Sequence, residues 1–397
     1  MKKSLVAIAA LAATGAFAQS SVTLYGRLDL GMQSNKVEST SAAGVGTSVK
    51  TTELAGAQNL WTGSRIGIRG SEDLGGGLKA NFVYEFRLNQ DGTAAADADT
   101  ANFGRVRTSL VQLQGDFGSV AVGTYLNPFD DIRLSAGNYG LAGGWSLDKI
   151  NGGVGFDARS INSVGYRSPA FGGGFFATFG TSNQTVSYQT GVTPGLSSGS
   201  NSSKGVIGSL GYSNGPISAL VAVGQGKARA AGATSAAAAV GGTPFVAPVS
   251  AVTASAPAVG AEVKINDFGL RASYNVGFAV PYLSFENAKR TTTGIDAANA
   301  SFGLGSNTSR GFEVGSSFPM GAFSPYVTFA VNKQTAVNGA GVTTIVKKTN
   351  ALQVGTKYDL SKRTFAYTGF GSSKDTTENA ATVRKESGFA LGLVHNF

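Results

Sequence analysis

The chain has 397 residues, of which 57 are glycine and only 14% are charged, and its formal net charge is +9. It contains no cysteine and one histidine, which excludes disulfide frameworks, thiol catalysis and multi-histidine metal sites. A soluble protein usually carries more charged residues on its surface than this chain can supply. Its hydrophobic fraction of 42% argues against disorder. The basic residues are spread along the chain, whereas a nucleic-acid site would concentrate them.

The first eighteen residues predict a cleaved secretory signal peptide. Lys2 and Lys3 form a basic start, residues 5–13 are apolar, and an Ala-x-Ala site ends at Ala18. The apolar run is too short to span a bilayer as a helix, so a membrane anchor is the weaker alternative. We therefore expect residues 1–18 to be a signal peptide and residues 19–397 to be a single exported domain.

Directly after the expected signal peptide, apolar and polar side chains begin to alternate with a period of two, and this pattern continues to the C-terminus. In residues 22–30, apolar residues and Gly26 fall on one face, while Thr23, Tyr25, Arg27 and Asp29 fall on the other. This alternation is typical of a β-strand with unlike faces. It recurs clearly at 80–88 and 389–397, and less sharply at 63–71, 103–114, 118–126, 160–168, 173–182, 204–213, 216–226, 265–274, 277–288, 309–318, 322–333, 348–360 and 363–373. About sixteen strands and almost no long helix are predicted.

The connections between these strands alternate in length. Short connections rich in Gly, Asn and Asp lie at 72–77, 115–118, 213–216 and 359–362, and long ones lie near 33–62, 91–102, 127–159, 183–203, 227–264, 289–308, 334–347 and 374–386. Short turns at one end and long loops at the other are typical of an outer-membrane β-barrel, with short periplasmic turns and long extracellular loops. A barrel also removes the open sheet edges that lipid cannot accommodate.

The alternative is a soluble, secreted β-sandwich or β-solenoid, whose strands would also alternate. Such a fold needs charged residues on its outer face. Here one face is apolar and often aromatic, while the opposite face carries Arg, Asp and Glu. This pattern favours an all-β transmembrane antiparallel barrel with lipid outside and water inside.

Several segments resemble the general porins of Burkholderia-, Bordetella- and Neisseria-type bacteria. The matching segments occur in the family's order at 21–29, 64–77, 115–123, 162–169 and 392–397. The resemblance implies a sixteen-stranded trimeric porin whose third loop, 127–159 here, folds into the barrel and narrows the pore. Gly123-Thr124-Tyr125 stands where family members often carry Gly-Arg-Gln, so one basic pore residue is expected to be missing.

The lumen of such a barrel is too wide for side chains to fill, and charged side chains and pore width would set its selectivity. The alternation places Arg27 and Arg87 on the lumen face, and Arg65 shares a face with Arg69. Each arginine could equally be a solvated wall residue away from the narrowest point. We expect weak anion preference, since these arginines outnumber the nearby lumen acids.

The start of the third loop supplies the opposite charges. Asp130 and Asp131 lie there, with Arg133 beside them. We hypothesise that the wall arginines face these carboxylates across a constriction, which would create a transverse field.

The last residue, Phe397, ends a strand with apolar residues at alternate positions, which resembles the outer-membrane assembly signal and implies the barrel-assembly machinery as a partner. The other expected partners are a second and third copy of the chain, outer-membrane lipid and lipopolysaccharide, and small hydrophilic solutes and ions. No nucleic acid, cofactor or metal is expected.

Passive diffusion of ions and small hydrophilic solutes is the predicted function. Two alternatives stay open, an adhesin or receptor barrel and a barrel enzyme. The enzyme has little support because the only G-x-S-x-G match, at 211–215, lies in a short hairpin and not between a strand and a helix.

Overall fold

The computed structural model describes residues 21–55, 61, 63–88, 103–133, 154–156, 159–189, 198–232, 262–293, 305–378 and 381–397. The expected signal peptide, residues 1–18, and most of the expected loop 227–264 lie outside these residues. No helix in the described part of the chain is long and apolar enough to cross a membrane.

Strands dominate the first half of the chain, with one short helix. In order they are β1 (Ser21–Thr40), β2 (Gly46–Ala55), β3 (Arg65–Gly75), β4 (Leu78–Leu88), β5 (Phe103–Gly115), β6 (Gly118–Leu126), the helix α2 (Pro128–Arg133), β7 (Arg159–Arg167), β8 (Phe175–Gln189) and β9 (Ser198–Asn214).

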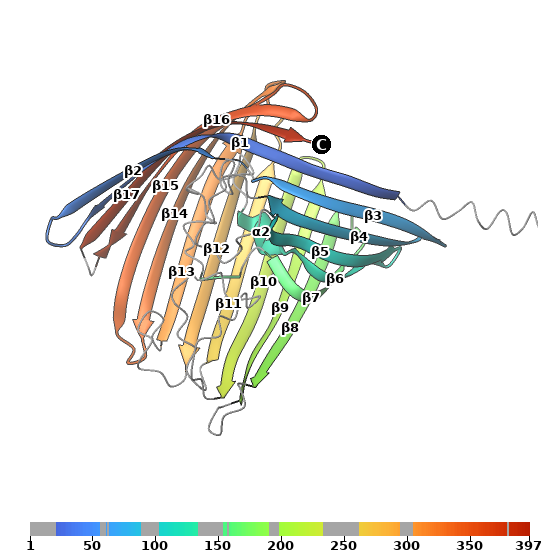
Figure 1. Ribbon diagram of the computed structural model, residues 1–397, viewed down its shortest axis with the longest axis horizontal. Coiled ribbons are helices and arrows are strands. Elements are labelled where there is room, and N and C mark those ends of the chain that lie inside the picture. Colours follow the sequence, from blue (N-terminus) through green and yellow to red (C-terminus); the bar gives the residue numbers. More distant parts are fainter. Residues whose placement is uncertain are drawn as a thin grey trace, which may run out of the picture.

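The second half continues as strands alone within the described ranges. These are β10 (Ile217–Gly232), β11 (Glu262–Tyr274), β12 (Val280–Thr293), β13 (Gly305–Ser317), β14 (Phe323–Asn338), β15 (Thr343–Asp359), β16 (Thr364–Thr377) and β17 (Thr382–Asn396). Figure 1 shows the short β3–β7 on one side and the longer β8–β17 on the other.

The strands form a closed antiparallel ring because β1 joins both ends of the sheet. One edge of β1 pairs with β17 over residues 27–40. The other edge pairs first with β3, over residues 21–27, and then with β2, over residues 31–40. Each remaining strand pairs with its neighbours in the chain, so that sixteen of the seventeen described strands close the ring and β2 extends it beside β1. The predicted barrel of about sixteen strands is confirmed.

The two faces of the barrel differ as the alternation predicts. On β1, Leu24, Leu28 and Leu30 are exposed on the outside. Tyr25 and Asp29 lie on the inside, where their hydroxyl and carboxylate find polar partners. Apolar side chains therefore face lipid, and the polar side chains face the lumen.

The long-loop end differs from prediction in several places, and the expected loop 183–203, for example, is strand over 183–189 and 198–203. Within the expected loop 33–62, β1 continues to Thr40 and turns back as β2. The expected loops 334–347 and 374–386 are mostly strand, with only short connections between β14 and β15 and between β16 and β17. The hydrogen-bonded ladder continues there into water, where both faces are polar, so the alternation that reveals a strand in lipid is lost.

Glycines opposite aromatic residues let rings lie flat on the inner wall. A Cβ atom at Gly67, for example, would lie 2.7 Å from the ring of Tyr25 on the neighbouring strand. The same relationship joins Tyr282 with Gly315, Tyr326 with Gly355, and Tyr367 with Gly392, each a directly opposed pair. Part of the glycine excess therefore serves ring packing across strands.

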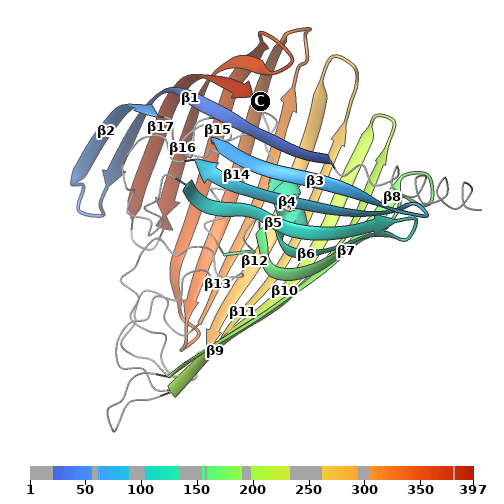
Figure 2. The same ribbon diagram turned by 45° about the vertical axis from the view of Figure 1, so that its right-hand side comes forward.

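Inside the ring, α2 packs against the inner faces of β9, β10, β11 and β12. Figures 1 and 2 show this helix within the ring of strands. The start of the third loop therefore folds into the barrel, as the resemblance implied.

Candidate functional site

Three predicted arginines lie side by side on the lumen wall. Arg27 of β1 is directly opposite Arg65 of β3, and Arg65 is directly opposite Arg87 of β4. The Nε atom of Arg27 donates a hydrogen bond to Oδ1 of Asn396 at 2.7 Å. Alternation placed these residues on one face, and strand pairing brings them together as a row across three strands.

Two further arginines extend this row. The register between β4 and β5 shifts next to Arg107, and Arg107 lies 2.8 Å from the carboxylate of Glu85 on β4. The Nε atom of Arg159, at the start of β7, donates to the carbonyl oxygen of Arg107 at 2.9 Å. A β-bulge re-aims the side chain that it carries, so Arg107 points into the lumen although it shares its alternation phase with the outward-facing Val111 and Leu113.

The row carries an excess of positive charge. Within the described part of the chain, the carboxylate of Glu85 forms ion pairs with Arg107 at 2.8 Å and with Arg65 at 3.8 Å. The charges of Arg27, Arg107 and Arg159 all act on Arg65. Like charges on directly opposed strand residues destabilise a sheet. We therefore interpret this row as serving the lumen and not the stability of the wall.

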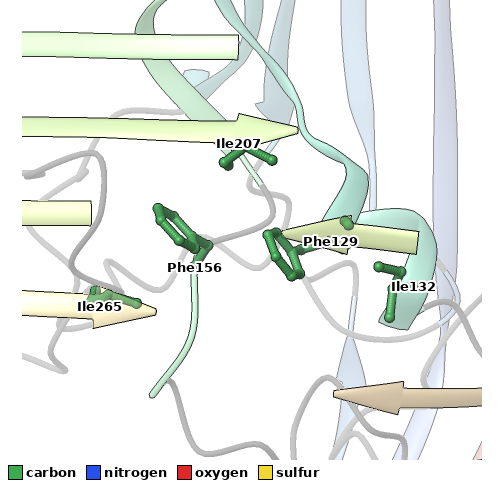
Figure 3. Close-up of a cluster of buried hydrophobic side chains, with 6 residues drawn as sticks. Phe129, Ile132, Phe156, Ile207 and Ile265 are labelled. Atoms are coloured by element: carbon green, nitrogen blue, oxygen red, sulfur yellow. The ribbon is translucent and has the colours of Figure 1, made fainter. Parts of the chain in front are cut away.

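The helix α2 is anchored on the opposite wall by a small hydrophobic cluster. Phe129 and Ile132 of α2 are fully buried, and the ring of Phe129 stacks on that of Phe156, with centroids 5.7 Å apart. Figure 3 shows these side chains together with Ile207 and Ile265 of the wall. The inner wall carries glycines at this point, which leave room for the cluster. A Cβ atom at Gly224 would lie within 2.7 Å of Phe156, and a Cβ atom at Gly269 would lie within 2.7 Å of Ile132.

Arg133 takes part in this anchor. Its guanidinium is buried and forms two hydrogen bonds to Glu286 of β12, at 2.8 and 2.5 Å, and lies 3.6 Å from Asp267 of β11. Asp267 also accepts the backbone N–H of Phe156 at 2.9 Å. The sequence predicts Arg133 among the constriction residues beside Asp130 and Asp131, and the structure instead holds its guanidinium in a buried ion pair. Partners more than a hundred residues away bury it, and no local pattern reveals them.

Asp130 and Asp131 lie on the other side of α2 from Phe129, Ile132 and Arg133, which are its buried residues. The helix contacts β11, which is the eighth strand from β3 in either direction around the ring. The arginine row and α2 thus lie on opposite sides of the lumen, and within the described ranges the structure shows no contact between their charges.

Asp131 lines a cavity of about 260 Å³ together with Arg167 and Phe176. Enclosure by the wall raises the pKa of the Asp131 carboxyl, while the charges of Arg167 and Arg271 act in the opposite direction.

A second segment folds inward from the β2–β3 connection, and the sequence alone does not reveal it. Trp61 is buried inside the barrel, with ring centroids 5.0 Å from Tyr367, 5.8 Å from Phe365 and 6.0 Å from Tyr326. Asp29 holds this segment by accepting the backbone N–H groups of Trp61 and Gly63, at 2.9 and 3.0 Å, and the hydroxyl of Tyr367 at 2.8 Å. The lumen is therefore narrowed from the β14–β16 side as well.

A set of cations stacked on aromatic rings lies nearer the short-turn end. Arg69, Arg167, Arg271 and Lys357 lie over Tyr25, Phe176, Tyr282 and Phe365, at 5.1, 4.0, 4.1 and 5.4 Å from the ring centroids. They belong to β3, β7, β11 and β15, which are four strands apart around the ring. The stacking holds each cation at the wall, so these charges surround the lumen.

Comparison with known proteins shows to which family this chain belongs. A family model described as Gram-negative porin matches residues 4–379. The chain belongs to the Gram-negative porin family. This porin is 34% identical to outer membrane porin protein 32 of Delftia acidovorans over 411 residues, covering 99% of this chain and 95% of that one. It is 28% identical to an outer membrane porin protein of Bordetella pertussis, covering both chains completely.

Solved structures agree on the fold. The porin matches an anion-selective porin from Comamonas acidovorans with a TM-score of 0.61 and 25% identity, over 96% of this chain and 100% of that one. It also matches OmpT of Vibrio cholerae, with a TM-score of 0.59 and 16% identity, over 95% of this chain and 98% of that one. The protein is thus an outer-membrane channel of the porin type and not an enzyme.

Proposed function

We propose that this porin passes ions and small hydrophilic solutes by passive diffusion with a weak preference for anions. The observation that carries the proposal is the in-register row of Arg27, Arg65 and Arg87, which faces the lumen opposite α2. Fixed cations in a narrow aqueous pore raise the local concentration of anions. Asp130 and Asp131 would supply the opposite side of a transverse field.

Two further observations support a preference for anions over cations. The stacked cations Arg69, Arg167, Arg271 and Lys357 surround the lumen below the row. The similar porin from Comamonas acidovorans is described as anion-selective. In the described residues, Asp267 and Glu286 pair with Arg133 in the wall, so they contribute little to the open lumen.

Self-association as a homotrimer is part of the proposal. A structural relative, OmpT of Vibrio cholerae, is described in a trimer form. The outer face of the short strands β3–β6 and of the start of β1 is apolar, with Val22, Leu24, Ile68, Val111 and Val122 exposed. Such a face suits contact with another copy.

The remaining expected partners also belong to this proposal. Export by the signal peptide 1–18, insertion by the barrel-assembly machinery through Phe397, and contact with outer-membrane lipid and lipopolysaccharide are what the sequence predicts of an outer-membrane barrel.

Reversal potentials of single channels in a salt gradient test the selectivity. Arg65→Ala removes the central charge of the row and is expected to lower the chloride-to-potassium permeability ratio severalfold, and Arg65→Glu should lower it further. Arg363→Ala, in the short β15–β16 connection, is the matched control and should leave the ratio unchanged. A cation-selective wild-type channel, or an unchanged ratio in Arg65→Glu, would contradict the proposal.

A further inference from the structure

The outside of the barrel carries lysines and arginines in a nearly continuous row at the long-loop end. Each alternates in phase with apolar side chains that face lipid, so each points outward. In this row, called the basic belt below, each residue lies one or two outward positions above an apolar residue. Its members are Lys36, Lys204, Lys227, Lys264, Lys289, Arg310, Lys333, Lys348, Lys374 and Lys385.

Strand pairing places several belt residues directly beside one another. Lys333 is opposite both Arg310 and Lys348, and Lys374 is opposite Lys385. Directly opposed like charges destabilise a sheet. A row of them across many strands therefore indicates an anionic ligand that lies along the barrel surface.

Carboxylates of the chain neutralise only part of the positive charge of the belt. Glu262 pairs with Lys227 and Lys264, Glu38 with Lys36, and Glu378 with Lys348. Within the described ranges, the remaining belt residues form no salt bridge: they are Lys204, Lys289, Arg310, Lys333, Lys374 and Lys385.

A hollow of about 420 Å³ lies on the outer surface at the β1–β17 seam. Lys36, Lys374 and Lys385 line it, together with Glu38, which is paired with Lys36, and Glu386, which is paired with Arg384. Hydroxyl and amide groups of Ser372, Ser387 and Asn350 also line it, and Leu352 and Phe329 contribute apolar surface. Three ammonium groups beside hydroxyl and amide groups suit a phosphorylated sugar.

The two ends of the barrel carry different outward-facing side chains, and this difference shows which membrane leaflet the basic belt faces. Outward positions at the short-turn end carry Tyr212, Tyr274 and Tyr358, residues typical of a membrane interface. The basic belt occurs at the long-loop end, which is the extracellular end of an outer-membrane barrel. A ligand of the belt therefore belongs to the outer leaflet.

We propose that the hollow lined by Lys36, Lys374 and Lys385 binds a phosphate of a phosphorylated glycolipid in the outer leaflet, namely lipopolysaccharide. The acyl chains lie on the apolar surface below, the phosphates contact the lysines, and the rest of the basic belt holds further copies around the barrel. The inference rests on the outer-membrane location, and it gives the lipid contact a defined place in the fold.

Binding of fluorescent bisphosphorylated lipid A to the purified full-length porin tests this site. We compare the wild type with the triple variant Lys36→Gln, Lys374→Gln, Lys385→Gln. The matched control is the triple variant Lys79→Gln, Lys362→Gln, Arg363→Gln, which removes the same net charge at the short-turn end. Loss of three ammonium groups should weaken lipid A binding at least about tenfold, and the control should bind like the wild type.

Two competitors identify the chemistry. Lipid A without its phosphates should bind the wild type as weakly as intact lipid A binds the triple variant, and inorganic phosphate at millimolar concentration should not displace lipid A. Equal binding by the triple variant, equal binding of the dephosphorylated lipid, or displacement by inorganic phosphate would each overturn the proposal. Single-channel conductance and reversal potential of the triple variant should equal those of the wild type, so failure of the lipid site is distinguishable from failure of the pore proposal.

Discussion

Arg133 and Glu286 are 153 residues apart in the chain and form a buried, two-point ion pair that fixes α2 to the inner wall. Asp267 and the backbone N–H of Phe156 complete the cluster. A buried charge that loses its partner is strongly destabilising. The position of the third loop, and thus the pore width on that side, depends on this pair.

Replacement of Arg133 by alanine should release α2 from the wall. Glu286 and Asp267 would be left buried without their cation, at a cost of about 3–5 kcal/mol. We expect larger and more variable single-channel conductance and a lower unfolding temperature, measured in planar bilayers and by thermal denaturation. Arg363→Ala serves as the exposed control. A variant with wild-type conductance and wild-type stability would show that the pair does not position the loop.

Asp29→Ala tests the inward segment at Trp61. Asp29 accepts three hydrogen bonds, from Trp61, Gly63 and Tyr367. Each buried donor that loses its acceptor costs about 1–3 kcal/mol, so Trp61 should leave the wall and the lumen should widen on the β14–β16 side. Conductance should rise together with exclusion size in a neutral-polymer assay, and Asp29→Asn should show a smaller effect. Unaltered polymer exclusion would argue against this second narrowing.

The charge of Asp131 should make anion preference depend on pH. The pKa of its carboxyl is raised because the wall encloses it. As pH falls through this raised pKa, the carboxylate takes up a proton and loses its negative charge, while the arginines stay charged. The chloride-to-potassium ratio should therefore increase in mild acid, before ordinary carboxyls titrate. Asp131→Asn should have the higher ratio already at neutral pH, and persistence of the full pH response in this variant would assign it to another group.

Phe397 closes the barrel at its short-turn end. Its N–H donates to the carbonyl oxygen of Gly26 and its carbonyl oxygen accepts the N–H of Gly26, both at 3.1 Å. Its ring covers Gly26 so closely that a Cβ atom there would clash with it. Deletion of Phe397 should reduce the amount of folded barrel in the outer membrane, and Gly26→Leu should weaken closure in the same way. Heat-modifiable mobility on gels measures both, with Phe389→Leu as a lipid-facing control; normal levels of folded barrel in the deletion variant would refute the role.

Alternation along the chain was enough to assign the lipid-facing side of most strands, because lipid and water act on each side chain separately and leave a period of two in the sequence. The lumen positions of Arg27, Arg65 and Arg87, the short turns and the number of strands in the ring all follow from that local pattern. The sequence also placed Asp130 and Asp131 at the start of the inward loop by resemblance to a known family.

Strand pairing in the folded barrel, and not any local pattern, sets which residues meet across strands. The in-register arginine row, the bulge that turns Arg107 toward Glu85, and the burial of Arg133 each depend on partners distant in the chain. The inward packing of Trp61 on Tyr367 is likewise a contact between distant segments. Strands that continue above the membrane left no alternation, because both their faces are polar. The basic residues, few and widely spread along the sequence, are brought by strand pairing into an inner arginine row and an outer basic belt.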